Sequence, residues 1–539
     1  MTSPLAQAVD WVAIAPAVVP AALAVAVLVA DLFLPPHRKQ LLVWVTVAGL
    51  VGALAALIPL RAGHHATFCL TDAQGGGCSY TADRFTLVVQ VLVLGGALLT
   101  ALLSAHSTGS PDAPDTPDAP GVPGAVGGPP EGEFWFLLLS SAAGAALLPA
   151  SRDLITLVVA LEVTTLPAFA LVALRRGDRL ASEAALKFFL TSVAATAVTL
   201  LGISFVYATT GSVHMSTVAH GLSHAPGQLH TLARAGAALT VVGFAFKLAV
   251  APFHFWVPDT YAGAPLPVAA YLSVVGKAAG FSGLILVTEV AFRPYADTWG
   301  PAMGVLAALT MTVGNVGALR QNPGTDRSAV RLLAWSSIGQ AGYLLVPLAA
   351  QSADRAPGYL VGTTVAYALM YGVVNLGAFA VAALVARSAP RGRLTDFRGL
   401  YGSRPFAALA LAFFLLCLAG LPPGVIGLFA KVAVFSSAVD GRHGWLAVIM
   451  AVNVVIALVY YLRWTALLFV RPEGAPSGVT LGARAAGSAV PADGGLSLAA
   501  APARTPLALT AAIALTAAGG LVLSGAPEIV LRYAQGTLL

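Results

Sequence analysis

The sequence predicts an all-α, polytopic membrane protein that crosses the bilayer about fourteen times. Only 10% of its 539 residues are charged and 58% are hydrophobic, a balance that no water-facing surface of this size could carry. Long apolar runs recur along the chain. The regular alternation of polar and apolar residues that marks the strands of a membrane barrel is absent from the sequence. A helical bundle is therefore the fold class we expect.

Each apolar run is long enough to span a hydrocarbon core of about 30 Å, which takes about 20 helical residues. The seventh run is interrupted at Pro252, and the twelfth at Pro422, Pro423 and Gly424. Broken helices survive at membrane depth only where the freed backbone groups meet protein or water, so each break predicts a hydrated cavity. The fourteen runs begin near Trp11, Leu41, Phe85, Glu133, Asp153, Glu183, Arg234, Pro267, Ala302, Ala329, Tyr359, Phe406, Trp445 and Pro506.

Interrupted helices in corresponding positions of two halves indicate inverted repeats. Pairing runs four to eight with runs nine to thirteen aligns the two broken helices, although Lys247 precedes its break and Lys431 follows its own. Two polar segments rich in helix breakers cannot pack a core and are predicted linkers. The predicted units are 1–106 with helices one to three, a Pro/Gly-rich cytoplasmic linker 107–132, a first repeat 133–290, a second repeat 301–470, a low-complexity linker 471–505, and helix fourteen with its tail 506–539.

The distribution of basic residues predicts the orientation of the chain. One set of alternate loops holds sixteen Lys and Arg residues and the opposite set holds eight, so the first set should be cytoplasmic and both termini should lie outside. The net charge of +6 is then a topology signal, because the arginines are not interleaved with aromatic residues as in a nucleic-acid surface. Cys69 and Cys78 fall in an outer loop, where a disulfide and two free thiols are both open to them.

Lysine is rare in this chain and concentrated in apolar runs. There are five lysines against twenty-four arginines, and four of the five, Lys187, Lys247, Lys277 and Lys431, lie in predicted helices. Arginine keeps its proton in a protein, whereas a buried lysine can lose it near neutral pH. These positions therefore predict groups that bind and release a proton.

Glu162, near the middle of the fifth run, is the predicted acidic partner of Lys247, because an unpaired carboxylate at that depth would cost several kcal/mol. Intramembrane charges can also serve only to hold helices together, and that alternative stays open for each of them. Lys187 lies four residues after Glu183, a spacing at which an ion pair needs no function. His254, beside the first break, is either a core histidine or a proton shuttle.

The chain shows no sequence signature of a redox centre. It has no glycine-rich dinucleotide loop, no Walker A motif, no CxxC cluster and no pair of histidines spaced for haem. The histidines at 214, 220, 224 and 230 lack the spacing of a metal site. We expect neither cofactor nor metal in this chain.

Four segments together resemble the antiporter-like membrane subunits of respiratory complex I, most closely the subunit N branch of bacterial NADH–quinone oxidoreductase. The resemblance covers about Glu133 to Val470. It is strongest in "FKLAVAPFHFWVPDTYAGAPLPVAAYLSVVGKAAG", "RLLAWSSIGQAGYLL", "VVNLGAFAV" and "DFRGLYGSRPFAALALAFFLLCLAGLPPGVIGLFAK". The lysine that ends "IGLFAK" and the absence of a long lateral helix after run fourteen argue against the two larger relatives.

The resemblance implies a function that the residues alone do not. In the family, positions matching Glu162, Lys247, Lys277 and Lys431 form a hydrophilic axis along the membrane midplane, and those matching Lys187 and His254 take a secondary part. The implied activity is proton translocation, a translocase step coupled to electron transfer from NADH to quinone. FMN, iron–sulfur clusters and the quinone site would lie in partner subunits, and the neighbours would be other complex I membrane subunits in a bacterial cytoplasmic membrane.

One residue departs from the family pattern. Relatives commonly have histidine before the "GY" of run ten, where this chain has Gln340. Glutamine does not titrate, so a proton relay at this point must use water or another residue. The alternative function is an Mrp-type cation/proton antiporter subunit, from the same superfamily but driven by ion gradients.

Overall fold

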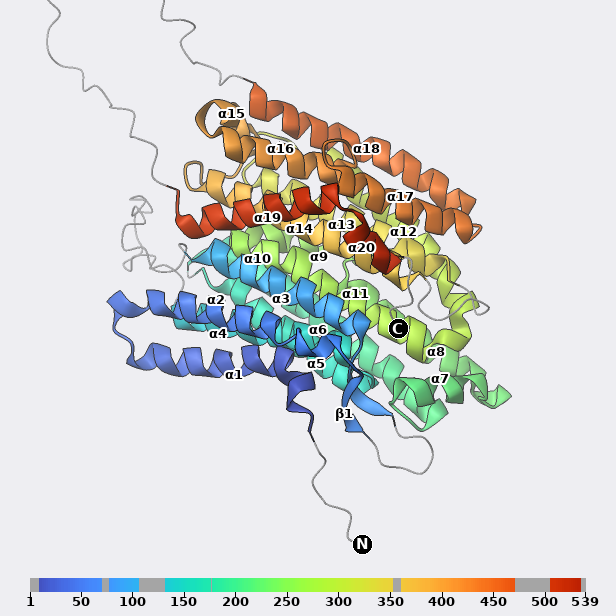
Figure 1. The fold of residues 1–539 in the computed structure, drawn as a ribbon. Coiled ribbons are helices and arrows are strands. Elements are labelled where there is room, and N and C mark those ends of the chain that lie inside the picture. Colours follow the sequence, from blue (N-terminus) through green and yellow to red (C-terminus); the bar gives the residue numbers. More distant parts are fainter. Residues whose placement is uncertain are drawn as a thin grey trace, which may run out of the picture.

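The computed structural model describes residues 9–69, 77–105, 131–175, 177–351, 360–470 and 505–534. Its helices run side by side in a bundle, with a small β-hairpin and α7 (Met215–Ser223) toward one end and α15 (Leu400–Ser403) at the other (Figure 1). Thirteen helices in this part of the chain are long and apolar enough to cross a membrane. The predicted polytopic helical fold is confirmed. The remaining predicted crossing is the broken twelfth run, whose first half, α16, is a shorter apolar helix of residues Pro405–Ala419.

A β-hairpin, which the sequence did not predict, lies between the second and third helices of the chain. Asp10 caps the first helix by accepting hydrogen bonds from the backbone N–H groups of Val12 and Ala13. The two strands are antiparallel and place Cys69 opposite Cys78, and these two residues form a disulfide. The structure thus decides between the two open alternatives for the cysteines. The elements are α1 (Trp11–Phe33), α2 (Gln40–Ala55), β1 (His65–Cys69), β2 (Cys78–Ala82) and α3 (Arg84–Ser104).

The segment predicted as the first repeat contains a helix that is broken and another that is locally underwound. In the seventh predicted run, the helix stops at Lys247 and a new helix starts at Trp256. In the eighth, a π-helical turn over Leu272–Gly276 directly precedes Lys277, and such turns are frequent at functional sites. The helices are α4 (Glu131–Leu147), α5 (Leu154–Ala173), α6 (Arg179–Thr210), α7 (Met215–Ser223), α8 (His230–Lys247), α9 (Trp256–Gly263), α10 (Leu266–Tyr271) and α11 (Lys277–Leu286).

The segment predicted as the second repeat contains the other broken helix. Here the helix stops at Ala419 and restarts at Val425, which confirms the predicted interruption at Pro422 to Gly424. The inverted relation between the halves stays a prediction. The helices are α12 (Ala296–Leu319), α13 (Ser328–Ala349), α14 (Val361–Ala386), α15 (Leu400–Ser403), α16, α17 (Val425–Asp440), α18 (Gly444–Phe469), α19 (Leu507–Gly525) and α20 (Glu528–Ala534).

Glycines let the central helices approach closely. A Cβ added to Gly314 of α12 would lie 2.2 Å from the backbone nitrogen of Gly339 in α13. Likewise, a Cβ on Gly144 of α4 would lie 2.5 Å from the backbone nitrogen of Thr164 in α5. Because lipid tails are as apolar as the side chains, such close packing supplies much of the attraction between membrane helices.

We expect Gly314→Ala to lower the free energy of unfolding by about 1–3 kcal/mol, since the methyl group would force α12 and α13 apart. The matched control is Gly95→Ala in α3, where an added Cβ meets no atom within 4 Å. There, alanine should be neutral or stabilising by up to about 1 kcal/mol because it favours helix. Thermal unfolding of the purified protein in detergent measures both. Equal midpoints for the two variants would contradict this account of the α12–α13 contact.

Candidate functional site

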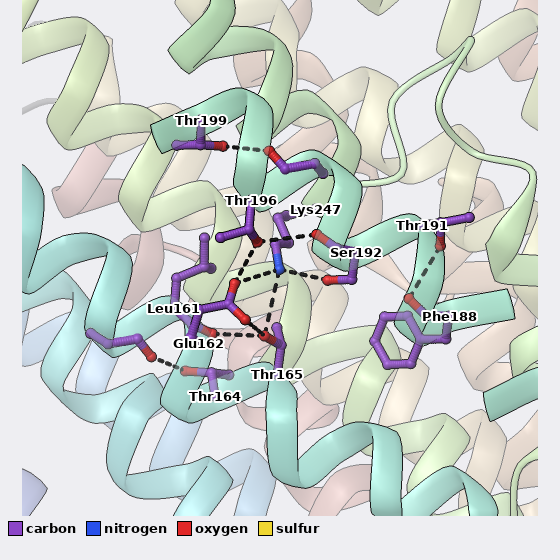
Figure 2. A network of polar contacts seen from close by, with 12 residues as sticks. Leu161, Glu162, Thr164, Thr165, Phe188, Thr191, Ser192, Thr196, Thr199 and Lys247 are labelled. Carbon is purple, nitrogen blue, oxygen red and sulfur yellow. Dashed lines mark hydrogen bonds and ion pairs between the residues drawn. The ribbon is translucent and has the colours of Figure 1, made fainter. Parts of the chain in front are cut away.

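An ion pair joins α5 and α8 near the middle of the bundle. The Nζ atom of Lys247 lies 2.9 Å from Oε1 of Glu162, and it also donates to Oγ of Ser192 in α6 at 2.6 Å. Thr196 of α6 donates to the same carboxylate oxygen at 2.6 Å. Figure 2 shows the Glu162 and Lys247 side chains pointing toward each other amid hydroxyl groups. The structure therefore places together the acid and base that the sequence paired.

The two partners differ in exposure. The Lys247 side chain is 5% exposed and that of Glu162 is 20% exposed. The ammonium thus lies inside the chain, while the carboxylate lies closer to the lateral surface of the bundle. Glu162 is therefore reachable from outside the bundle, whereas Lys247 is enclosed by it.

The break after Lys247 is supported by protein groups. The backbone N–H of Ala251 donates to Oγ1 of Thr310 in α12 at 3.0 Å. The indole N–H of Trp256 donates to the carbonyl oxygen of Phe246 at 3.3 Å. These bonds replace part of the helical ladder that Pro252 interrupts, as a break within a membrane requires.

A cavity connects the first lysine to the second. Lys247 and Lys277 both line it, together with Thr165, Tyr261 and Tyr271. The ammonium group of Lys277 donates to the backbone carbonyl oxygen of Ser337 in α13. The two lysines thus share one cavity, while the hydration predicted for the break at Pro252 stays a prediction.

Lys431 lies at the second break. Its Nζ atom donates to the carbonyl oxygens of Leu418 at 2.9 Å and Ala419 at 2.8 Å, the last residues of α16. It also lies 5.4 Å from the centre of the Tyr343 ring. These carbonyl groups lost their helical partners at the break, so the ammonium group satisfies them at the negative end of the helix dipole.

Lys187 differs from the other three lysines. Its side chain is 45% exposed and pairs with Glu183 at 2.8 Å, the partner that the spacing indicated. It also pairs at 2.9 Å with Asp259 of α9, a residue that sequence reasoning missed. Arg331 of α13 binds the other oxygen of Asp259 at 3.0 Å. Lys187 therefore belongs to a surface network among α6, α9 and α13, apart from the buried lysines.

His254 lies in the unwound segment between α8 and α9. It is partly buried, and its ring centroid is 5.6 Å from that of Trp335. Its Nδ1 atom has no hydrogen-bond partner within the described part of the chain. None of the contacts described for His254 reaches Glu162 or the buried lysines, so both readings of this histidine stay open.

Ser192 and Thr196 are the site residues that sequence reasoning missed. They lie four residues apart in the apolar helix α6, a spacing that puts both on one face. Polar side chains one turn apart in a membrane span are a signal that could have found them. Their hydroxyl groups provide the Glu162–Lys247 pair with partners that water would otherwise supply.

Comparison with known proteins identifies the family. The profile of the family described as "NADH:quinone oxidoreductase/Mrp antiporter, TM" matches residues 151–457, more than half of the chain. A NADH-quinone oxidoreductase subunit N 2 of Streptomyces griseus is 65% identical over 99% of this chain and 94% of its own length. The chain belongs to the subunit N family of NADH–quinone oxidoreductase. A second subunit N, from Salinispora tropica, is 44% identical over 86% of each chain.

Solved structures agree on the fold of this subunit N family member. A chain of respiratory complex I from Thermus thermophilus is 29% identical, with a TM-score of 0.69 over 97% of this chain and 100% of that one. A chain of the Mrp complex from Dietzia is 21% identical, with a TM-score of 0.76 over 97% and 96% of the two chains. The Mrp likeness shows a shared fold only. The 65% identity to the Streptomyces subunit N 2, against 21% to the Mrp chain, places this chain with subunit N.

Because the Glu162–Lys247 pair is largely buried, removing one charge should cost more stability than removing both. Glu162→Gln leaves the Lys247 ammonium without a counter-ion, so we expect it to destabilise the protein by about 3 kcal/mol. The double variant Glu162→Gln with Lys247→Met removes both charges and should return to within about 1 kcal/mol of wild type. Thermal unfolding and the amount of subunit in the membrane measure both variants. A double variant as unstable as the single one would argue against direct coupling.

Proposed function

We propose that this chain is a proton-translocating membrane subunit of NADH–quinone oxidoreductase, and that protons move along Glu162, Lys247, Lys277 and Lys431. The observation that carries the proposal is the Glu162–Lys247 pair, with its nitrogen and oxygen 2.9 Å apart at the edge of a cavity that Lys277 also lines. Charges at such depth are costly and mark ion pathways more often than they serve packing. The relatives named as subunit N support the same reading.

The pair acts as the switch in this proposal. A carboxylate beside the ammonium favours the charged lysine, so weakening the contact promotes release of the proton into the cavity. Lys277 then receives it and passes it toward Lys431. Lys187 and His254 take secondary parts, Lys187 at the surface beside Asp259 and His254 at the break.

The partners follow from the family. The chain is one subunit of a multi-subunit membrane complex, as in the respiratory complex I whose chain it resembles. Its neighbours would be the other antiporter-like and small membrane subunits. FMN, iron–sulfur clusters and the quinone site would belong to those partners, and no cofactor to this chain.

We infer that the chain is a multi-pass protein of the bacterial cytoplasmic membrane with both termini outside. The arginine-rich segment around α15 would face the cytoplasm. The Cys69–Cys78 disulfide then lies in the outer compartment, where oxidising conditions maintain it.

The Mrp-type antiporter is the alternative, because the matching family profile includes both kinds of protein. Purification from the native membrane separates the two functions. Copurifying iron–sulfur and flavin subunits would support the oxidoreductase, and copurifying small antiporter subunits would support the Mrp type.

Lys247→Ala should remove this subunit's share of the protons translocated per NADH oxidised, because the titrating group is lost. The protein should remain in the membrane, since the buried ammonium is deleted and the Glu162 carboxylate left behind is 20% exposed and still accepts a hydrogen bond from Thr196. The Glu162→Gln, Lys247→Met double variant should assemble and still not translocate. NADH-driven proton uptake in vesicles, normalised to assembled complex, provides the measurement. Restored translocation in the double variant would leave the pair with a structural role only.

Lys277→Arg should reduce this subunit's translocation to about a tenth or less, since arginine keeps the charge but does not release the proton. Its guanidinium can still donate to the Ser337 carbonyl, so assembly should persist. Lys39→Arg is the matched control, because Lys39 pairs with Asp31 at 2.8 Å outside the proposed path. Normal proton uptake in Lys277→Arg would restrict Lys277 to an electrostatic role.

A further inference from the structure

The residue that departs from the family pattern, Gln340, joins two tyrosines. It lies in α13 and is 3% exposed. Its Nε2 atom donates to the hydroxyl of Tyr461 in α18 at 3.2 Å, and its Oε1 atom accepts from the hydroxyl of Tyr367 in α14 at 2.5 Å. Ser336, one turn earlier, shares a 2.5 Å hydrogen bond with Tyr461. We name these four residues, Ser336, Tyr461, Gln340 and Tyr367, the hydroxyl bridge.

The hydroxyl bridge lies between the second and third buried lysines. At one end, Lys277 donates to the backbone carbonyl of Ser337, the residue next to Ser336. At the other end, the Tyr367 ring stacks on the Tyr343 ring with centroids 6.1 Å apart. Lys431 lies 5.4 Å from that Tyr343 ring. The bridge therefore spans the interval that a proton must cross from Lys277 to Lys431.

Unsatisfied hydroxyl groups flank the bridge. Ser337 Oγ, Tyr343 Oη and Tyr261 Oη are buried; Tyr261 lies near Ser337 and Tyr343 near Asn315, but none of the three atoms makes a well-formed hydrogen bond within the residues that the structure describes. Buried polar groups in proteins are hydrogen-bonded with few exceptions, and ordered water is the usual partner where protein groups are absent. These atoms mark places for water beside both ends of the bridge.

The chemistry of the bridge suits proton transfer without a titrating side chain at position 340. A hydroxyl group both donates and accepts, so it can bind an incoming proton on its oxygen and release its own to the next acceptor. One O–H bond forms as another breaks, and the hydroxyl is neutral before and after the step. An amide cannot do this readily, but it holds one hydroxyl as a donor and the other as an acceptor.

We propose that Gln340 is a positioning residue that orients the Tyr461 and Tyr367 hydroxyls, and that these hydroxyls with intervening water carry the proton from Lys277 to Lys431. This inference rests on the proposed function, because it requires that protons pass between these lysines. The competing explanation is that the bridge only fastens α13, α14 and α18 together. The two differ in what happens to proton translocation in a complex that has assembled normally.

The test compares variants of the bridge with a buried tyrosine elsewhere in the chain. Gln340→Leu removes both amide contacts, and Tyr367→Phe and Tyr461→Phe each remove one hydroxyl. The control is Tyr80→Phe, because Tyr80 of β2 is also buried but donates to the carbonyl oxygen of Ala13 in α1 at 2.9 Å, away from the bridge. In vesicles containing the assembled complex, each bridge variant should reduce this subunit's proton translocation to about a tenth or less of the wild-type value. The control should retain it.

A pH profile adds a readout that packing alone would not change. Gln340→His restores a bridging group that ionises near pH 6.5. Above that pH, the neutral ring both donates and accepts, so translocation should persist. Below it, the imidazolium only donates and adds a charge between two lysines, so translocation should fall with an inflection that wild type lacks.

Two results separate the failure of this inference from failure of the proposed function. If the bridge variants translocate normally while Lys277→Arg does not, the bridge is only structural and the lysine path stands. If Lys277→Arg also translocates normally, the lysine path and the bridge fall together. Should Gln340→Leu not assemble, the tyrosine variants and the Gln340→His profile decide, and a flat profile with normal translocation in Tyr367→Phe would overturn the proposal.

Discussion

The cost of an ammonium group within a membrane is the constraint that organises this protein. Away from water, a lysine keeps its charge only where oxygen atoms surround it, and its deprotonated form is favoured where they do not. Three lysines here are 8% exposed or less. Lys247 ends a helix, Lys277 directly follows a π-helical turn, and Lys431 reaches the carbonyl groups at the end of the preceding helix, so each lies beside an interruption of regular helix.

The three lysines meet that constraint in different ways, and the difference suggests their order of action. Lys247 is bound by a carboxylate and by side-chain hydroxyls, all of which can move or change charge. Lys277 and Lys431 are bound by backbone carbonyls, which are neutral and fixed by their helices. The surroundings of Lys247 can therefore change by side-chain movement, whereas those of Lys277 and Lys431 are set by the backbone.

Breaking a helix in the membrane has to be compensated by neighbouring elements. Thr310 from α12 and the Phe246 carbonyl satisfy groups at the first break, and Lys431 itself satisfies carbonyls at the second. Close glycine contacts between α12 and α13 hold one of these partners in place. The interruptions are thus part of the packed interior, and Lys431, which stabilises the second, is also a member of the proposed path.

The sequence by itself determined the number of crossings to within one helix, the two breaks and the intramembrane charges at Glu162, Lys247, Lys277 and Lys431. It could do so because hydrophobic length, proline and the cost of a lone charge are properties of a residue and its immediate neighbours. Only the tertiary structure decided the second partner of Lys187, the closure of the Cys69–Cys78 disulfide and the bridge around Gln340. Apart from the local disulfide, these contacts join residues far apart in the chain, and which oxygen meets which nitrogen depends on how the helices rotate and pack. Local patterns do not carry that information.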